Sequence, residues 1–156
     1  MFILTLITAL GCGLIAGIFY AFSSFIMKSL GKLPPAQGIA AMQRINIDVI
    51  NPWFMAVFMG TAATSAAIVV ITTLNWDAPN TTWRLAGAVL YLVGTFGTTI
   101  VFNVPLNNRL AKPAPDSNNA ADLWTHYLKT WTAWNTTRTA AALAACTVLI
   151  MAMCGE

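Results

Sequence analysis

Long runs without a charged residue dominate the chain, at residues 2–27, 53–75, 85–108 and 139–155. A helix that spans a bilayer needs roughly 20 mostly apolar residues, with a lower limit near 17. The first three runs exceed this length. The fourth is at the limit, so its helix is expected to begin before Thr139 and to carry Arg138 to the membrane. Because the runs are continuous rather than alternating, they favour spanning helices over the strands of a β-barrel.

The pattern predicts an all-α fold, a four-helix transmembrane bundle that forms one membrane domain over residues 1–156. The helices are expected at about residues 2–29, 36–75, 83–104 and 119–154.

Two of these helices have additional features. Residues 37–50 have a helical period of apolar and polar positions, which predicts an amphipathic helix before the second span, with Pro52 as a kink or first turn. The fourth helix is expected to extend into the cytoplasm and to be capped by Asp116, Ser117 or Asn118. Its first half carries polar and aromatic residues at three- and four-residue steps, on one stripe: Trp124, Tyr127, Trp131, Asn135 and Arg138.

Composition and charge support the membrane interpretation and suggest an orientation. Of 156 residues, 58% are hydrophobic and 8% charged, against about 25% charged in an ordinary soluble domain. The basic residues of the two long loops are Lys28, Lys32, Arg44, Arg109, Lys112 and Lys129, whereas the opposite side has only Arg84. Positive charge stays in the cytoplasm, so we expect a multi-pass protein of the cell membrane with cytoplasmic long loops and both termini outside.

The expected partners follow from the same features. The formal charge of +3 is a topology signal and predicts no nucleic-acid partner. The first and third helices carry glycines at close-packing spacing, including Gly13, Gly17, Gly87 and Gly94. These faces make a homo-oligomer in the bilayer possible.

Polar residues gather at the end of the bundle that is expected to be cytoplasmic. Gln43, Asn46 and Asp48 precede the second span, Asn103 and Asn107 end the third, and His126, Asn135 and Arg138 lie in the fourth. Polar groups at membrane depth are costly and are functional candidates by default. We therefore expect a pocket here that takes a hydrophobic small molecule, with Gln43 and Asn46 among its binding residues.

Three of these residues are candidates for catalysis. Arg138 either forms a structural clamp to Asn103 or Asp48, or holds a ligand oxygen such as a phenolate or carboxylate. His126 is either a solvent-facing residue or a general base suited to neutral pH, and Asp48 is the rival base. The single histidine excludes a multi-histidine metal site, and no metal is expected. A haem with one axial histidine ligand stays an open alternative, but the sequence has no haem-attachment motif. The tryptophans, Trp131 among them, are either interfacial anchors or the wall of a pocket for a flat ligand.

Four pieces in order carry a family resemblance: Ala16-Gly17-x-x-Tyr20-x-Phe22-Ser23 with Met27-x-x-Leu30-x-x-Leu33-Pro34; Met42-Gln43-x-Ile45-Asn46 with Asn51-Pro52-x-Phe54; Asn103-Val104-Pro105-Leu106-Asn107; and Trp124-x-x-Tyr127-x-x-x-Trp131-x-x-x-Asn135-x-x-Arg138. Together they resemble the anthrone oxygenase-like family of small membrane proteins. The resemblance implies oxidation of anthrones to anthraquinones without a conventional cofactor. That chemistry needs a base to form a carbanion that meets dioxygen, and donors that hold the developing oxyanion. By resemblance, the donors are Asn103, Asn107, Asn135 and Arg138, and Trp131 is a wall that stacks on the ring.

The sequence departs from this family at one position. Many members have histidine directly after the asparagine of the last motif, where this chain has Thr136. Threonine is no general base, so His126 or Asp48 would have to substitute. Three functions stay open: a cofactor-independent oxygenase acting on a flat phenolic or quinone-like molecule, a non-catalytic binding or accessory subunit, and a small transporter.

Overall fold

The computed structural model describes residues 1–112 and 120–154. Its elements in chain order are α1 (Phe2–Ala21), η1 (Phe22–Ile26), α2 (Met27–Leu30), α3 (Pro35–Asp48), α4 (Pro52–Leu74), α5 (Thr81–Val89), η2 (Leu90–Gly97), η3 (Thr99–Asn103), α6 (Val104–Leu110) and α7 (Ala120–Cys154), where η marks a π-helical segment. The described residues contain no strand. The predicted all-α fold is confirmed.

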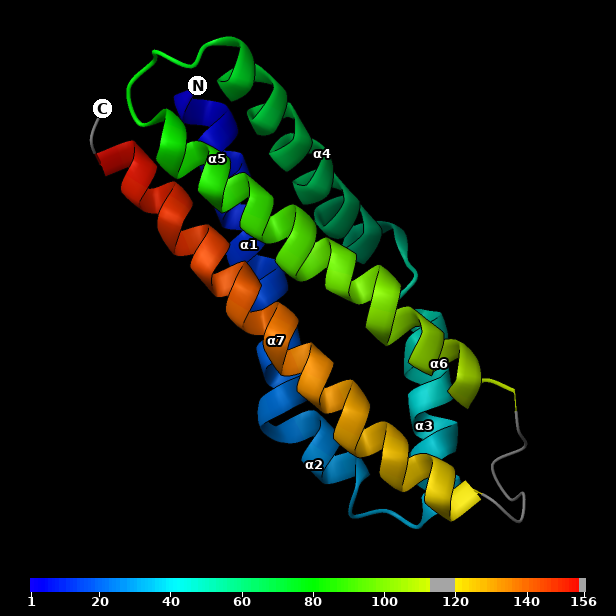
Figure 1. The fold of residues 1–156 in the computed structure, drawn as a ribbon. Coiled ribbons are helices and arrows are strands. Elements are labelled where there is room, and N and C mark those ends of the chain that lie inside the picture. Colours follow the sequence, from blue (N-terminus) through cyan, green and yellow to red (C-terminus); the bar gives the residue numbers. More distant parts are fainter. Residues whose placement is uncertain (113–119, 155–156) are drawn as a thin grey trace.

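Four helical stretches are long and apolar enough to cross a membrane: Phe2–Leu30, Pro52–Leu74, Thr81–Leu110 and Ala120–Cys154. They pack lengthwise into one elongated bundle (Figure 1). α1 begins and α7 ends at the same end of the bundle, and α2, α3 and α6 lie at the other end. The four apolar helices indicate a multi-pass membrane protein, as the sequence predicts, whereas the orientation of the bundle stays a prediction.

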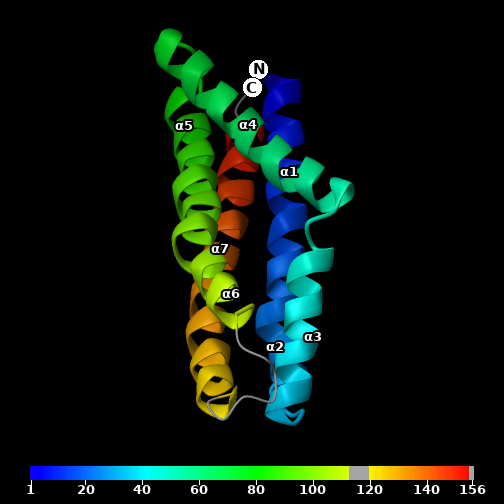
Figure 2. The same ribbon diagram turned by 90° about the vertical axis from the view of Figure 1, so that its right-hand side faces the viewer.

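The helix expected over residues 36–75 is two helices. α3 ends at Asp48, and α4 begins at Pro52. Asn51 has an extended backbone because a following proline disfavours the helical conformation. The Asn51 Oδ1 accepts hydrogen bonds from the backbone N–H groups of Trp53 (3.1 Å) and Phe54 (3.0 Å), which is an N-cap. α4 therefore starts in a new direction and crosses α1 obliquely (Figure 2). That α3 is an amphipathic helix remains a prediction.

The third span continues to Leu110, past its expected end at residue 104. Pro105 lies at the start of α6, directly after the π-helical segment η3. A proline is tolerated at such a position because the hydrogen-bond ladder is already changing register there. The caps expected at Asp116, Ser117 and Asn118, and the expected start of the fourth helix at residue 119, lie outside the described residues.

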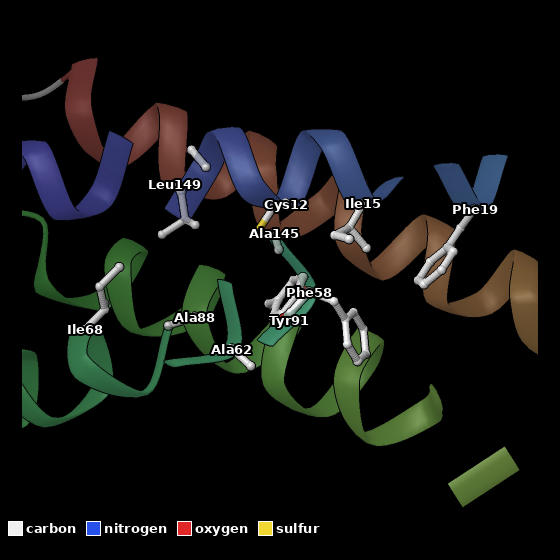
Figure 3. Packing of buried hydrophobic residues seen from close by; sticks show 11 residues of the cluster. Cys12, Ile15, Phe19, Phe58, Ala62, Ile68, Ala88, Tyr91, Ala145 and Leu149 are labelled. Atoms are coloured by element: carbon white, nitrogen blue, oxygen red, sulfur yellow. The ribbon is translucent and has the colours of Figure 1, made fainter. Parts of the chain in front are cut away.

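Two buried clusters divide the bundle along its length. The first, here the small-residue section, joins α1, α4, α5, η2 and α7 (Figure 3) and consists of Ala9, Cys12, Ile15, Phe19, Phe58, Ala62, Ile68, Ala88, Tyr91, Ala145 and Leu149. The second, here the aromatic section, lies toward α2, α3 and α6 and consists of Met27, Ile39, Met42, Leu110, Ala120, Trp124, Tyr127 and Trp131.

Candidate functional site

A cavity of about 530 Å³ lies where the two sections meet, between α1, α3, α4, η3, α6 and α7. Its walls are mostly apolar, and they include Phe19 and Phe58 of the small-residue section and Met42 and Trp131 of the aromatic section. Its polar lining residues are Gln43, Asn46, Thr99, Asn107, Asn108 and Arg138. Sites for small molecules typically have this size and this ratio of apolar wall to polar groups.

Arg138 brings a cation to the cavity wall from the middle of α7. Its residue surface is 5% exposed, and its guanidinium carbon lies 3.7 Å from the centre of the Phe19 ring and 5.2 Å from that of Trp131. Within the described residues, no carboxylate pairs with Arg138. The ion pair in that part of the chain joins Arg44 and Asp48, whose side chains are exposed. Within the described part of the chain, the guanidinium is therefore surrounded by aromatic faces and neutral oxygens.

The Arg138 guanidinium is held by neutral acceptors. The Asn135 Oδ1 accepts from Nε (3.0 Å) and from Nη2 (2.7 Å), and the Thr99 Oγ1 accepts from Nη1 (3.1 Å). One N–H on each Nη has no acceptor within residues 1–112 and 120–154. Arg138 is therefore fixed in direction and still has donors for a ligand oxygen.

Asn135 is fully buried and links the arginine to α1. Its Nδ2 donates to the Phe19 carbonyl and to the Ser23 Oγ, both at 2.7 Å. The Phe19 carbonyl lies where the α1 ladder changes to the π-helical segment η1. It accepts from the backbone N–H of Phe22, and the Asn135 amide gives it a second donor at this irregular turn. Because both ends of the amide are engaged by protein, the structure makes Asn135 a residue that positions Arg138.

Asn107 has a fixed amide orientation. Its Oδ1 accepts from the Trp131 Nε1 (2.7 Å) and from the Tyr127 hydroxyl (2.8 Å). An indole N–H is only a donor, so the atom that faces it must be the amide oxygen. The Nδ2 of Asn107 has no partner within the described part of the chain, and the residue lines the cavity. It is available as a second donor.

The other amide candidates take different places. Asn103 is buried and donates from Nδ2 to the Trp131 carbonyl (3.2 Å), but it does not line the cavity, and its Oδ1 is buried without a partner in the part of the chain that is described. Gln43 lines the cavity and also donates from Nε2 to the Leu110 carbonyl (2.8 Å) at the end of α6. Asn46 lines the cavity and interacts with the Tyr127 side chain.

The two candidate bases lie apart from the cavity lining. Asp48 has an exposed side chain at the end of α3, paired with Arg44 at 2.8 Å. His126 is exposed on α7. The clamp expected between Arg138 and Asn103 or Asp48 is wrong, since Asn135 and Thr99 accept its hydrogen bonds. Asp48 lies at the same end of the bundle as the other polar candidates, but its side chain is on the exposed side of α3, next to Arg44.

Sequence reasoning found the α7 stripe but missed the residues that complete the site. Trp124, Tyr127, Trp131, Asn135 and Arg138 lie on the one stripe that the spacing predicts, and the structure shows that all five are buried. Thr99 and Phe19 were not singled out, because a threonine and a phenylalanine inside apolar runs carry no distinguishing signal. Thr136 does not line the cavity; its Oγ1 donates to the Thr132 carbonyl (2.9 Å) and lies 3.0 Å from the Ser23 Oγ.

One comparison with known proteins gives a match. The model of the family described as Anthrone oxygenase matches residues 53–148, which run from the start of α4 into the second half of α7. The match includes Asn107, Trp131, Asn135 and Arg138 but not the motif pieces at residues 16–46. No curated protein and no solved structure matches the chain significantly.

Proposed function

Since the chain belongs to the anthrone oxygenase family, we propose that the cavity binds a flat, hydrophobic phenolic or quinone-like molecule and places one of its oxygens on Arg138. The observation that carries this proposal is a buried guanidinium without a carboxylate partner in the described chain, at the wall of an apolar cavity. Burying an unpaired charge is costly. An anionic ligand oxygen reduces this cost, because it supplies the missing opposite charge and accepts the unused N–H groups.

The remaining lining suits the body of such a ligand. Phe19, Phe22, Phe58 and Trp131 offer aromatic faces, and the Nδ2 of Asn107 offers a donor away from Arg138. Aromatic side chains prefer to stack or to meet a ring edge-on. We propose that the ring system lies against Trp131, with Arg138 and Asn107 selecting its oxygens.

Catalysis would follow from stabilising the ionised ligand. An anthrone loses a proton from its ring methylene carbon and becomes an enolate, whose oxygen Arg138 holds. The carbanion carbon adds dioxygen, and the terminal oxygen of the resulting peroxide takes up a proton to give a hydroperoxide. The O–O bond and the remaining C–H bond of that carbon then break, and a carbonyl forms. In sum, anthrone and dioxygen give anthraquinone and one water. The chain contributes the oxyanion site, the apolar walls and the orientation of the ring, and dioxygen is the oxidant.

The proton has no obvious acceptor on the cavity wall. Neither a carboxylate nor an imidazole is among the lining residues that the structure describes, so in this proposal the proton leaves to water past Asn46 and Asn108. The same observation favours the second candidate function, a protein that binds the molecule without oxidising it. The two functions share the site and differ only in oxygen consumption.

The test uses the full chain in lipid nanodiscs. Binding of anthrone is followed by tryptophan fluorescence, and its oxidation by an oxygen electrode and by the absorbance of anthraquinone. The Arg138→Gln variant loses a charge-assisted hydrogen bond of about 1.5–3 kcal/mol, so we expect affinity to fall about 10- to 100-fold. Arg138→Lys keeps the charge but not the forked geometry of the guanidinium, so its affinity is expected to lie between those of wild type and Arg138→Gln.

The matched control is Arg84→Gln. Arg84 is also a buried arginine, but it lies in α5, at the far end of the small-residue section. The Arg84→Gln substitution is expected to leave the affinity for anthrone unchanged, whether or not it lowers thermal stability. Equal affinity in wild type and Arg138→Gln would refute the proposed site. Binding without oxygen uptake would assign the chain to the non-catalytic function.

A further inference from the structure

The rim of the cavity is apolar and exposed on one side. Ile47, Ile50, Met59, Ile100 and Val104 all line the cavity, yet they are also exposed on the outer surface, Ile50 at 72% and Ile47 at 64%. A residue that lines the cavity and is also exposed on the outer surface lies at an opening of the cavity. These residues come from α3, the turn after it, α4, η3 and α6, so the opening lies below α4 and between α3 and α6 (Figure 2).

This opening borders two membrane-spanning helices as well as α3 and the turn that follows it. Met59 lies in α4, and Ile100 and Val104 lie in the third apolar stretch, Thr81–Leu110, so the opening is flanked by two candidate spans. Trp53, in the first turn of α4, is 86% exposed beside it. Exposed tryptophan is typical of the boundary between hydrocarbon and head groups. A cluster of exposed apolar side chains on that boundary faces acyl chains.

The polar side of the rim is smaller. Among the described lining residues, Asn108 is the exposed polar one, and it lies on α6 next to the exposed lining residue Ala111. A ligand from water would have to pass there. A neutral, ring-shaped hydrocarbon with one or two oxygens partitions into the bilayer, where its concentration is far higher than in water.

We propose that the cavity takes its ligand sideways from the bilayer, through the opening at Ile50, Ile100 and Val104, and that its substrates are therefore neutral molecules dissolved in the membrane. Such a molecule enters with its oxygen protonated or as a ketone and becomes anionic only at Arg138. This inference rests on the proposed function, and it adds the route and the physical state of the substrate.

The first test needs no ligand. A nitroxide is attached at Met55→Cys, a partly buried lining position, in a chain whose Cys146 and Cys154 are alanine, while the fully buried Cys12 stays. Its collision rates with dioxygen, which concentrates in lipid, and with a water-soluble nickel chelate are compared in nanodiscs. The references are labels at Val70→Cys, an exposed position in the second half of the candidate span α4, and at Gln37→Cys, an exposed position in α3 outside the four spans.

We expect the label at residue 55 to behave like the one at residue 70, with dioxygen collisions dominant. Collisions dominated by the nickel chelate, as expected at residue 37, would overturn the inference. The result is independent of whether anthrone binds, so the opening and the proposed function can fail separately.

The second test measures ligand entry with substitutions on neighbouring residues. Ile100→Trp narrows the opening, whereas Val101→Trp adds the same bulk to an exposed neighbour in η3 that does not line the cavity. We expect Ile100→Trp to slow anthrone association about tenfold with little change at equilibrium, and Val101→Trp to leave the rate unchanged. Asn108→Trp tests the aqueous route. Slow entry in Asn108→Trp with normal entry in Ile100→Trp would overturn the lateral route.

Discussion

The small-residue section and the aromatic section share α7 but pack in different ways. α1, α4, α5 and η2 complete the first section, and α2, α3 and α6 complete the second. In the first, glycine and alanine allow the helices to approach closely, and a Cβ placed on Gly87 would clash with the side chain of Leu149. In the second, large rings separate the helices and need partners for their polar atoms, as the Trp131 Nε1 and the Tyr127 hydroxyl do at Asn107. The cavity lies where one kind of packing changes into the other.

This difference explains why a site forms at one level of the bundle. In the small-residue section, close approach of the helices at positions such as Gly87 leaves little space between them. Helices separated by rings cannot fill every gap, and the amides that satisfy the rings bring donors to the remaining space. Arg138 lies at the boundary, with Phe19 of the small-residue section and Trp131 of the aromatic section on either side.

The largest loss of stability is expected when Asn135, at the junction of the two sections, is replaced. Asn135→Leu removes both acceptor contacts to the Arg138 guanidinium and leaves the cation poorly solvated. At about 1.5–3 kcal/mol for a hydrogen bond to a charged group, we expect a loss of about 3 kcal/mol, measured by unfolding in mixed detergent micelles.

The control for this prediction is the double variant Asn135→Leu/Arg138→Leu. Replacing both partners with apolar groups removes the buried charge, so much of the stability is expected to return. A double variant less stable than Asn135→Leu would contradict the assignment of Asn135 as the group that holds the arginine.

A smaller effect is expected from overfilling the small-residue section. Gly87→Ala places a methyl group against Leu149, which must move, so we expect a loss of about 1–3 kcal/mol. Gly60→Ala is the matched control because nothing lies within 4 Å of its added Cβ. It is expected to be neutral or slightly stabilising, since alanine is the better helix former. Equal losses in thermal unfolding of the two variants would mean that close approach does not stabilise this section.

The smallest effects separate stability from binding. Tyr91→Phe removes the hydroxyl that donates to the Phe58 carbonyl (3.1 Å), and Tyr127→Phe removes the hydroxyl that donates to Asn107. Hydrogen bonds between membrane helices are worth about 0.6 kcal/mol on average, so both variants should lose a similar, small amount of stability. Only Tyr127→Phe is expected to weaken anthrone binding, because Asn107 then loses one of the two groups that fix its amide.

Titration calorimetry in nanodiscs compares the two tyrosine variants with Tyr20→Phe, whose ring is exposed on α1. If Tyr91→Phe weakened binding as much as Tyr127→Phe, the loss of affinity could not be assigned to the amide of Asn107.

Much of this arrangement could be predicted because its signals are local. Spanning helices need only a long apolar run, and the α7 stripe needs only the helical period. Other features depend on contacts between distant segments. The π-helical segments η1, η2 and η3 have no recognised pattern in the sequence. Thr99 is a partner of Arg138 because η3 and α7 pack together and bring the Thr99 Oγ1 within 3.1 Å of the Arg138 Nη1.

The sequence by itself determined four apolar helices, a first half of the last helix that is rich in polar and aromatic residues, and the position of Arg138 on the same stripe as Trp131 and Asn135. These follow from hydrophobicity and from the angle between successive residues of a helix, which act within one segment. Only the tertiary structure decided that Asp48 faces outward, that Asn135 holds the arginine, and that an apolar opening connects the cavity to the outer surface. The physical reason is that hydrogen-bond direction and the space between helices depend on how segments meet, and a single segment does not fix how it meets another.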